Sequence, residues 1–319
     1  MPAHDDWSRL GFIGVTATRS SINQVFPAWA RELGLEGVRL DPVDLPIGSP
    51  PERYREVVAE IAQDPYHHGA LVTSHKVRLL EAAADLFDEL DPLARLANEV
   101  SCISKRDGRL RGHAKDPITA GRALEDFVPP DHFASHAEVL CFGAGGSGLA
   151  ISIHLATRPD AHDRPRRITL VNRRRARLDE CRAILQRLGP PEPAPVFVYV
   201  SNADPRTNDD LMGALPAGSL VINATGLGKD QPGSPITDTG RFPQQGLAWE
   251  INYRGELDFL HQARAQQEEH GLLVEDGWRY FVHGWSAVID EVFDLGLGEG
   301  DVERLSEIAA EARTGGSGR

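Results

Sequence analysis

Residues 139–148 of this chain read Val-Leu-Cys-Phe-Gly-Ala-Gly-Gly-Ser-Gly, an apolar run that passes directly into a glycine-rich turn. A helix-compatible, mostly apolar segment follows from residue 146 to residue 156. Glycines at such a turn let the backbone approach a pyrophosphate at the start of a helix. We therefore predict a strand, turn and helix that bind a dinucleotide through Gly143, Ala144, Gly145, Gly146 and Ser147. The alternative is an ordinary glycine-rich turn between a strand and a helix.

Arginines follow the next apolar run, about 24 residues beyond Gly148. A carboxylate at this place usually accepts from the ribose 2′-hydroxyl of NAD. Guanidinium groups instead pair with a 2′-phosphate in bidentate fashion. The sequence therefore predicts NADP, bound by Asn172, Arg173 and Arg174. The alternative is a solvated basic helix start, although cations are disfavoured there unless an anion is near.

Short apolar runs alternate with amphipathic segments along most of the chain, which predicts an α/β fold with a largely parallel sheet. We expect strands at residues 10–15, 37–40, 69–73, 99–103, 138–142, 168–171, 196–200, 219–222 and 247–251. We expect helices at residues 23–33, 51–61, 117–127, 146–156, 176–188 and 256–270.

Composition excludes several classes of function. A formal net charge of −13 argues against a nucleic-acid partner. No apolar run approaches the roughly 20 residues that span a bilayer, and residues 1–10 are too polar for a secretory signal. Three scattered cysteines, Cys102, Cys141 and Cys181, favour a reducing compartment. We expect a cytoplasmic protein, a monomer or homodimer, with a small-molecule substrate, no membrane partner and no metal.

Further motifs in the second half resemble the cofactor half of the shikimate dehydrogenases. Ile222–Gly226, with Gly228, is similar to the family's I-N-A-T-x-x-G loop, which borders the nicotinamide. The resemblance implies that Asn223, Ala224, Thr225 and Gly226 contact the cofactor. Trp249–Tyr253 is similar to the family's D-x-x-Y segment, which implies a substrate contact from Tyr253.

The first half of the chain carries three further motifs of this family in the same order. Val72–Lys76 resembles N-V-T-x-P-H-K shortened by one residue, and Gly112–Asp116 resembles G-x-N-T-D. Gly14–Ile22 resembles the N-terminal substrate loop weakly. The order and rough spacing of these motifs match those of the family from about Leu10 to Phe293, which is nearly the whole chain. The resemblance implies that Lys76 and Asp116 form the catalytic pair and that Ser20 and Thr73 bind substrate.

The catalytic pair also makes chemical sense by itself. Hydride transfer to a carbonyl leaves an alkoxide that must gain a proton, and a lysine ammonium can stabilise that oxygen and donate the proton. A carboxylate such as that of Asp116 can orient the ammonium and bind the next hydroxyl. The alternatives are a solvent-exposed Lys76 at a helix start and an Asp116 that caps the helix after it.

Three departures from the family pattern concern substrate contacts. Ile22 stands where the substrate loop has its second serine, Ser101 replaces the substrate-binding asparagine, and Gly284 replaces a glutamine near the C-terminus. We expect Ser101 and Gly284 to line the substrate site and the substrate to differ from shikimate. The sequence leaves open whether the substrate touches any of four nearby polar residues, namely Arg19, His113, Lys115 and His283.

The resemblance implies two α/β domains with the active site in the cleft between them. The substrate-binding catalytic domain is expected at residues 1–117 plus 277–319, and the NADP-binding Rossmann domain at 118–276. The expected function is NADP-linked hydride transfer to or from a small hydroxy or keto carboxylic acid. One alternative is an authentic shikimate or quinate dehydrogenase, and another is a dinucleotide-binding sensor without turnover.

Overall fold

The computed structural model describes residues 7–229 and 231–315. Residues 1–6, which belong to the stretch too polar for a secretory signal, lie outside the described residues. The chain divides into two compact units. Unit 1 comprises Met1–Lys115 and Val282–Arg319, and unit 2 comprises Asp116–Phe281. The assignment of substrate and cofactor to separate domains stays a prediction. No helix in the described ranges is both long and apolar enough to cross a membrane.

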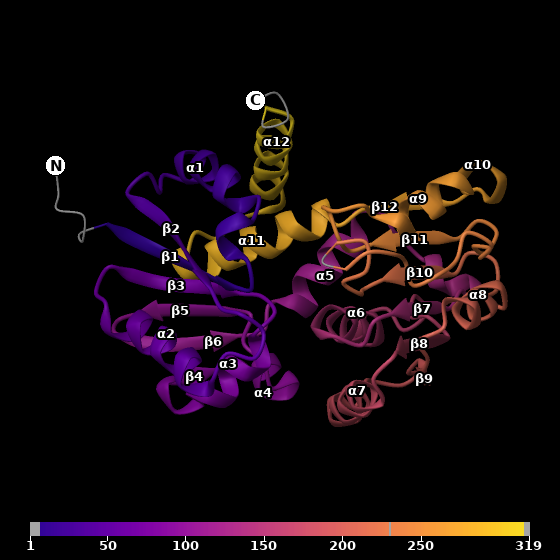
Figure 1. Cartoon of the computed structure of the whole chain (residues 1–319), viewed down its shortest axis with the longest axis horizontal. Helices are drawn as coiled ribbons and strands as arrows, with labels where there is room; N and C mark the ends of the chain where they lie inside the picture. The colour runs from indigo at the N-terminus through magenta and orange to yellow at the C-terminus, as the bar shows by residue number, and fades with distance from the viewer. Residues whose placement is uncertain (1–6, 230, 316–319) are drawn as a thin grey trace. The chain divides into compact units, whose positions relative to one another are not determined.

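Unit 1 is built on a six-stranded sheet in the order β2-β1-β3-β5-β6-β4 (Figure 1). Its strands are β1 (Ser8–Gly14), β2 (Val38–Asp44), β3 (His67–Val72), β4 (Glu89–Leu90), β5 (Cys102–Arg106) and β6 (Arg109–His113). The expectation of a largely parallel sheet fails for β5, which runs antiparallel to both β3 and β6. Asp107 and Gly108 join β5 to β6 with φ of 53° and 73°, the positive values typical of a two-residue hairpin turn.

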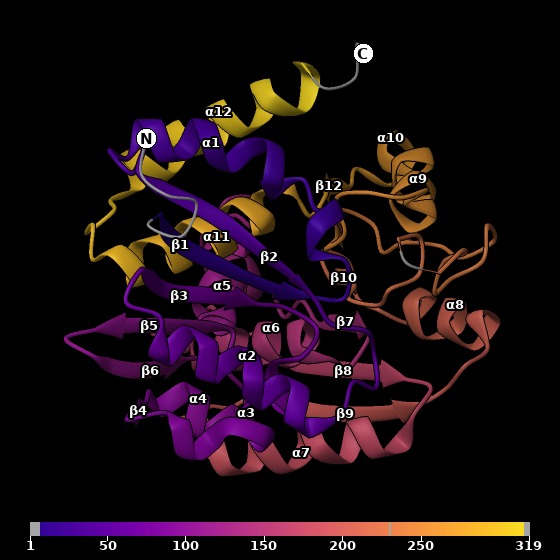
Figure 2. The ribbon, with the colours of Figure 1, turned by 60° about the vertical axis from the view of Figure 1, so that its left-hand side comes forward.

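Helices surround the sheet of unit 1. They are the short 3₁₀ helices η1 (Ala17–Arg19) and η2 (Ala84–Leu86), α1 (Ile22–Glu32), α2 (Pro51–Gln63), α3 (Lys76–Ala83), α4 (Pro92–Ala97) and α12 (Glu299–Gly315). Helix α11 (Trp278–Phe293) begins in unit 2 and ends in unit 1. Helices α1 and α12 lie side by side in Figure 2, and the Trp29 indole donates to the Leu305 carbonyl at 2.8 Å. The C-terminal helix is thereby tied to the N-terminal one.

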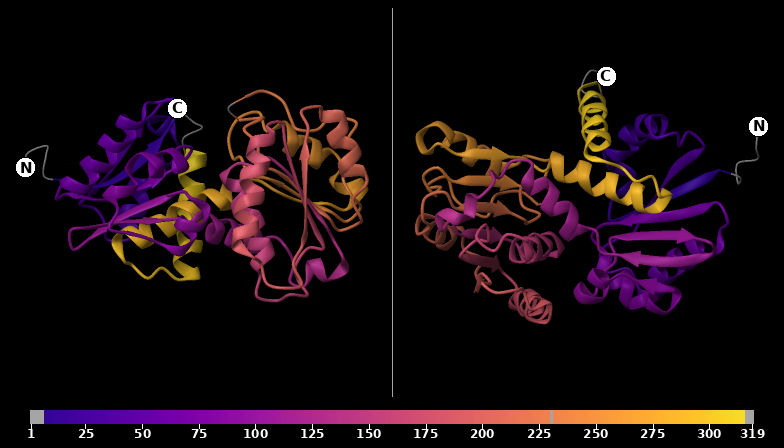
Figure 3. Two further views of the ribbon diagram at one scale, coloured as in Figure 1. Left: turned by 90° about the horizontal axis from the view of Figure 1, so that it is seen from below. Right: turned by 180° about the vertical axis from the view of Figure 1, so that it is seen from behind.

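Unit 2 contains a six-stranded parallel sheet in the order β12-β11-β10-β7-β8-β9. Its strands are β7 (Val139–Phe142), β8 (Arg167–Asn172), β9 (Val196–Ser201), β10 (Leu220–Asn223), β11 (Leu247–Glu250) and β12 (Leu273–Glu275). Figure 3 shows helices on both faces of this sheet. The strand order reverses beside β7, and such a reversal is where doubly wound sheets bind ligands.

The helical elements of unit 2 are α5 (Asp116–Glu125), η3 (His132–Ser135), α6 (Gly146–Thr157), α7 (Arg175–Leu188), α8 (Pro205–Gly213), α9 (Asp258–Ala265) and α10 (Gln267–His270). The single helix expected at residues 256–270 is therefore divided. The division falls at Gln266, whose side chain donates to the Gly240 carbonyl at 2.9 Å and accepts from the Phe242 amide at 3.2 Å.

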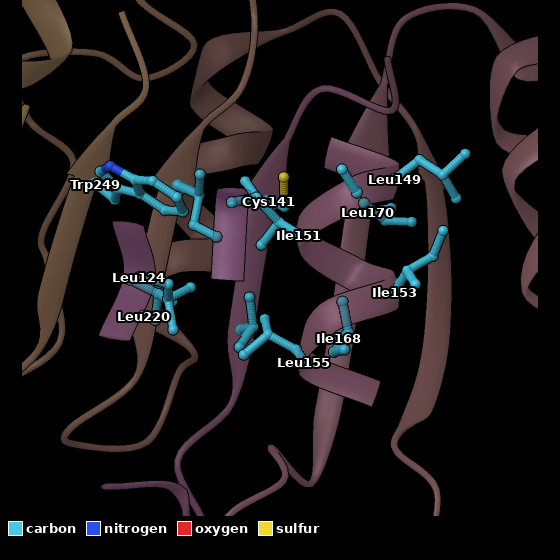
Figure 4. Close-up of a cluster of buried hydrophobic side chains, with 14 of the residues drawn as sticks. Leu124, Cys141, Leu149, Ile151, Ile153, Leu155, Ile168, Leu170, Leu220 and Trp249 are labelled. Carbon is cyan, nitrogen blue, oxygen red and sulfur yellow. The ribbon is translucent and has the colours of Figure 1, made fainter. Parts of the chain in front are cut away.

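Alternation along the strands of unit 2 produces two apolar layers. In β7, Val139 and Cys141 join the cluster packed against α5, α6 and α7, whereas Leu140 and Phe142 join the cluster packed against α8 and α9. Figure 4 shows the first cluster, with side chains of α6 lying against β7 and β8. Successive side chains of a strand point to opposite faces, so a sheet covered on both sides needs an unbroken apolar run. This explains the sequence of β7.

Candidate active site

Segments with predicted cofactor roles leave the sheet of unit 2 side by side. The strand register pairs Phe142 with Val171 on one side and with Asn223 on the other. Asn223 in turn pairs with Glu250. Because these strands are parallel, their carboxyl ends meet at one edge of the sheet. The structure thus brings together the turn after β7, the arginines after β8 and the loop after β10.

The turn after β7 requires glycine at two positions. Gly143 has a φ of 111°, and a β-carbon there would lie 2.3 Å from the Ala224 carbonyl oxygen. A β-carbon on Gly148 would lie 2.1 Å from the Gly143 carbonyl oxygen. Helix α6 therefore packs directly on the turn, and the turn packs on the loop after β10.

The start of α6 has the properties of an anion site. The helix begins at Gly146, and no side chain caps it because the N-cap residue is Gly145. Gly145, Gly146 and Ser147 are partly exposed, whereas Ala144 is buried and its carbonyl accepts from the Cys181 thiol at 3.3 Å. The first amides of a helix carry partial positive charge and bind phosphate oxygens readily.

Two exposed arginines lie at the end of β8. The Asn172 side-chain oxygen accepts from the Arg174 amide at 2.9 Å and shapes the turn into α7. Arg175 pairs with Asp179 at 3.0 Å, but no ion pair of Arg173 or Arg174 occurs within residues 7–229 and 231–315. Two unpaired guanidinium groups at a helix start favour a bound anion.

The loop after β10 is held by buried amides and one buried carboxylate. The Asn223 amide donates to one Glu250 oxygen at 2.6 Å, and the Asn252 amide donates to the other at 2.6 Å. The Asn223 oxygen accepts from the Thr225 amide at 3.1 Å and from the Thr225 hydroxyl at 2.6 Å. These contacts occupy the polar side-chain groups of Asn223 and Thr225. The backbone of the loop is therefore the part that a ligand can bind.

Ala224 and Gly226 lie within this loop, partly buried and exposed respectively. The sequence patterns gave no role to Glu250 or Asn252, although both belong to the segment compared with the D-x-x-Y motif. Tyr253, from the same segment, packs against Trp278 and Phe281, with ring centroids at 5.6 and 4.8 Å. Its ring is therefore fixed by an aromatic cluster, and it is half-buried.

In unit 1, the ends of β1 and β3 fix the backbone around Lys76. The Thr73 amide and hydroxyl donate to the Ile13 carbonyl at 2.9 and 3.3 Å. The Lys76 amide donates to the Thr73 carbonyl at 3.2 Å, and the Lys76 carbonyl accepts from the Val100 amide at 3.3 Å. Lys76 is the first residue of α3 and is half-buried.

His75 next to Lys76 has a structural role. It is only 3% exposed, its Nε2 lies 2.8 Å from the Leu45 carbonyl, and its Nδ1 lies 3.1 Å from the Tyr54 hydroxyl. Burial lowers the pKa of His75, so the ring is neutral at pH 7 and donates to Leu45. This histidine anchors the start of α3 to the loop before α2.

The loop after β1 is closed by one asparagine. The Asn23 amide donates to the Ala17, Thr18 and Ser20 carbonyls at 2.8, 3.2 and 3.0 Å. Ser20 is half-buried and Arg19 is exposed. Ile22, the residue at the family's second serine position, is fully buried in the core. Because the Ile22 side chain is fully buried, it has no exposed surface with which to contact a substrate.

The residues that precede Asp116 are held by a polar cluster, which we call the Glu291 cluster. The Lys115 amide donates to the Ser101 hydroxyl at 2.8 Å, and the Lys115 ammonium pairs with Glu291 of α11. His113 bonds to Ser104 at 2.8 Å and lies 3.6 Å from Glu291. The side chains of Ser101, His113 and Lys115 thus each bond to another residue of unit 1. Asp116 follows directly as the first residue of α5.

We expect the Glu291→Gln variant to be less stable than the wild type by about 1–3 kcal/mol at neutral pH, because Lys115 loses its charged partner. Burial alone would raise the pKa of Glu291, but the Lys115 hydrogen bond and the nearby His113, Lys115 and Arg106 charges outweigh it and lower that pKa. The contribution is therefore present above the ordinary value of 4.5 and is lost as pH falls further.

Urea unfolding at several pH values tests this prediction, with the exposed Glu36→Gln as the matched control. The two variants should differ at neutral pH and converge in acid. Equal stability of Glu291→Gln and wild type at neutral pH would show that the Glu291 cluster contributes nothing.

Gly284 and His283 lie on α11. His283 is 5% exposed, whereas Gly284 is half-buried. A β-carbon added at Gly284 would meet no neighbouring atom within 4 Å, so a longer side chain has room there. In the described part of the chain, no three His, Cys, Asp or Glu side chains gather as a metal site. The expectation of no metal stays a prediction.

Unit 1 has a cavity of about 410 Å³ that is lined by none of the predicted site residues. It is lined by Arg9, Gly11, Ile13, Asp41, Val43, Val57, Glu60, Ile61, Gln63, Asp64 and His67. His67 begins β3, whereas Thr73 follows the end of that strand. The cavity therefore reaches the amino end of β3, and it also touches Ile13 and Val43 near the carboxyl ends of β1 and β2.

Comparison with known proteins identifies the family. No protein-family model matches the chain. The shikimate dehydrogenase (NADP(+)) of Methylocella silvestris is 31% identical over 257 residues, covering 80% of this chain and 79% of the relative. That of an Arthrobacter species is 30% identical over 282 residues, covering 86% of both chains. The chain belongs to the shikimate dehydrogenase family. The resemblance seen in the motifs is thereby confirmed.

Solved structures show which fold the chain has. The quinate dehydrogenase from Corynebacterium glutamicum, in complex with NAD, matches with a TM-score of 0.74 and 21% identity, over 96% of this chain and 99% of that one. A 5-ketofructose reductase of Gluconobacter matches with a TM-score of 0.66 and 20% identity, over 94% and 98%. The predicted α/β fold with a Rossmann-type domain is confirmed.

Shikimate dehydrogenases of this family are NADP-dependent oxidoreductases, so the predicted enzyme class and cofactor are confirmed at the level of the family. The individual site residues stay predictions, as do the cytoplasmic location and the oligomeric state. The two curated relatives are both named for shikimate, so their names give no support to another substrate.

Proposed function

We propose that this chain transfers hydride between NADP(H) and a small hydroxylated carboxylic acid or its keto form. The observation that carries the proposal is the convergence of an uncapped helix start and two exposed arginines at one edge of a parallel sheet. A dinucleotide with a 2′-phosphate has the two separated phosphate groups that such an arrangement can bind. When bound, its nicotinamide supplies or accepts the hydride.

In this proposal the chain holds the cofactor through three contacts. The amides of Gly146 and Ser147 bind the pyrophosphate, and Gly143 allows the close approach that a side chain would block. Arg173 and Arg174 bind the 2′-phosphate. The backbone of residues 224–226 borders the nicotinamide.

Lys76 and Asp116 are the proposed catalytic pair. The fixed backbone on both sides of Lys76 limits where its ammonium can reach, which favours a defined role in stabilising the reacting oxygen. The ammonium donates the proton in reduction, and its neutral form accepts one in oxidation. The Asp116 carboxylate orients the ammonium and binds a neighbouring substrate hydroxyl.

The proposed substrate differs from shikimate. Ile22 is buried and apolar, the Ser101 hydroxyl is committed to the Lys115 amide, and Gly284 has no side chain to donate a hydrogen bond. Each lost contact to a polar substrate group weakens its binding. Thr73, Ser20 and Tyr253 remain as proposed substrate ligands. Shikimate itself is the second candidate, because the curated relatives carry that name.

We expect the double variant Arg173→Ala/Arg174→Ala to bind NADP(H) at least about tenfold more weakly than the wild type, because it loses charge-assisted contacts to the 2′-phosphate. NAD(H) affinity should change little. Calorimetric titration with both cofactors measures this. Arg175→Ala/Arg177→Ala is the matched control, because these two arginines already pair with Asp179 and Glu180. Equal wild-type affinity for NADP and NAD would refute the cofactor assignment.

A further inference from the structure

Glu250 lies at the carboxyl end of β11, in the row of strand ends where the cofactor segments meet. It is fully buried, with an exposed fraction of 0%. Three donors surround its two oxygens. They are the Asn223 amide at 2.6 Å, the Asn252 side-chain amide at 2.6 Å and the Asn252 backbone amide at 2.8 Å. A carboxylate, which only accepts, satisfies all three, whereas a protonated acid would present a hydrogen to one of them.

The two asparagines carry the effect of Glu250 to the loop after β10. Asn223 accepts from the Thr225 amide and hydroxyl, and Asn252 donates to the Thr225 carbonyl at 3.1 Å. The Thr225 hydroxyl in turn accepts from the Leu227 amide at 3.1 Å. Three of these hydrogen bonds involve the backbone of residues 225–227, at the Thr225 amide, the Thr225 carbonyl and the Leu227 amide. Glu250 is therefore the common acceptor on which the loop's shape depends.

We propose that Glu250 is a positioning residue that, as a carboxylate, holds residues 224–227 in the shape that binds NADP(H), so that cofactor affinity falls when Glu250 is protonated. The inference rests on the proposed function, because it takes this loop as part of the cofactor site. In this proposal the fully buried Glu250 acts through the two asparagines and not by contact with cofactor or substrate.

The protonation of Glu250 falls in the neutral range. Burial raises the pKa of Glu250 to about 7, opposed by the Asn223 and Asn252 hydrogen bonds and by the charge of Lys229. Lys229 is the charged group close enough to act on it from the loop after β10. On the β12 side, Glu275 lies opposite Trp249, and its charged neighbours are Asp276, Arg279, Asp126 and Arg264.

Stability and cofactor affinity should therefore respond to pH in opposite directions. Between the ordinary pKa of 4.5 and about 7, the folded chain keeps a proton that the unfolded chain releases. The contribution of Glu250 to folding stability consequently fades as pH rises through this window. Cofactor affinity should increase over the same window. If Glu250 affected cofactor affinity only through the stability of the fold, both the folding stability and the cofactor affinity would fall as pH rises.

The test is the dissociation constant of NADPH for wild type and Glu250→Gln between about pH 5.5 and 8.5. The glutamine is isosteric, but its amide faces the Asn223 amide, so one donor loses its acceptor. We expect Glu250→Gln to bind NADPH roughly tenfold more weakly at about pH 8, as for one hydrogen bond to a charged group. The two proteins should converge at about pH 5.5.

Two controls separate the alternatives. NADH lacks the 2′-phosphate, which itself titrates near neutral pH, so the difference between the two proteins must also appear with NADH. Glu138→Gln changes a buried glutamate at the opposite edge of the same sheet and should leave NADPH affinity unchanged. If Glu250→Gln does not fold, Glu250→Asp keeps the carboxylate and should retain the pH dependence.

Equal affinity of wild type and Glu250→Gln at about pH 8 would overturn the role of Glu250 while leaving the proposed function intact. A wild-type affinity for NADH that does not change with pH would overturn it as well. A wild type that binds no NADPH at any pH would overturn the proposed function and the role of Glu250 together.

Discussion

Replacing Lys76 with alanine is expected to lower kcat by about a thousandfold, within the range for loss of a positioned proton donor that also stabilises charge. The affinity for NADP(H) should stay within about twofold of the wild type, because the proposed cofactor segments all belong to unit 2 and Lys76 belongs to unit 1. Steady-state kinetics with the best substrate, together with NADPH titration, measures both quantities.

Arg78→Ala is the matched control for Lys76, because it removes a cation from the same helix without removing the proposed proton donor. It should keep nearly all activity. A Lys76→Ala enzyme that retained most of its kcat would exclude Lys76 from the proton transfer, whatever the behaviour of the control.

The second large effect concerns shikimate. We expect its kcat/KM to lie orders of magnitude below about 10⁴ M⁻¹s⁻¹, the lower end of the usual range for enzymes. Buried polar groups of the substrate would lack partners at Ile22, Ser101 and Gly284, each at a cost of roughly 1–3 kcal/mol. Steady-state comparison of shikimate, quinate and other hydroxy acids at saturating NADP tests this. Efficient oxidation of shikimate would establish the plain family function instead.

One substitution makes the substrate prediction sharper. Gly284→Gln restores the family's residue at a position with space around it, and it should raise kcat/KM for shikimate by about tenfold. Ala287→Gln places the same side chain about one turn further along α11 and should leave kcat/KM unchanged. A Gly284→Gln variant that is no better with shikimate would show that the missing glutamine does not determine the substrate.

The sequence predicted unit 2 well because its signals are local. The run from Val139 to Phe142 is apolar on both faces of a strand, and the turn after it needs glycine for steric reasons at Gly143 and Gly148. Register between parallel strands then places the arginines after β8 beside that turn. Each of these steps depends on short stretches of sequence.

Contacts between distant residues could not be predicted from the sequence. Whether Lys115 meets the substrate is open from its motif alone, because its partner Glu291 lies 176 positions away. Only the fold shows His75 held between Leu45 and Tyr54. Glu250 could be aligned with a motif, but its contact with the Asn223 amide becomes visible only when β10 and β11 are paired.

The hairpin between β5 and β6 is a different case, because its signal is local. Asp107-Gly108 is a dipeptide typical of a two-residue hairpin turn, and it stands between two short strands. The alternation of strands and helices along the rest of the chain favoured a parallel sheet and therefore did not predict this hairpin.

The most direct test of the proposed function is NADPH formation by the wild-type chain mixed with NADP⁺ and a panel of cyclic and acyclic hydroxy acids. We expect turnover that requires NADP⁺ in preference to NAD⁺, that is lost in Lys76→Ala, and that is faster with another acid than with shikimate. Tight NADPH binding without turnover of any acid would contradict it and would favour a dinucleotide-binding sensor.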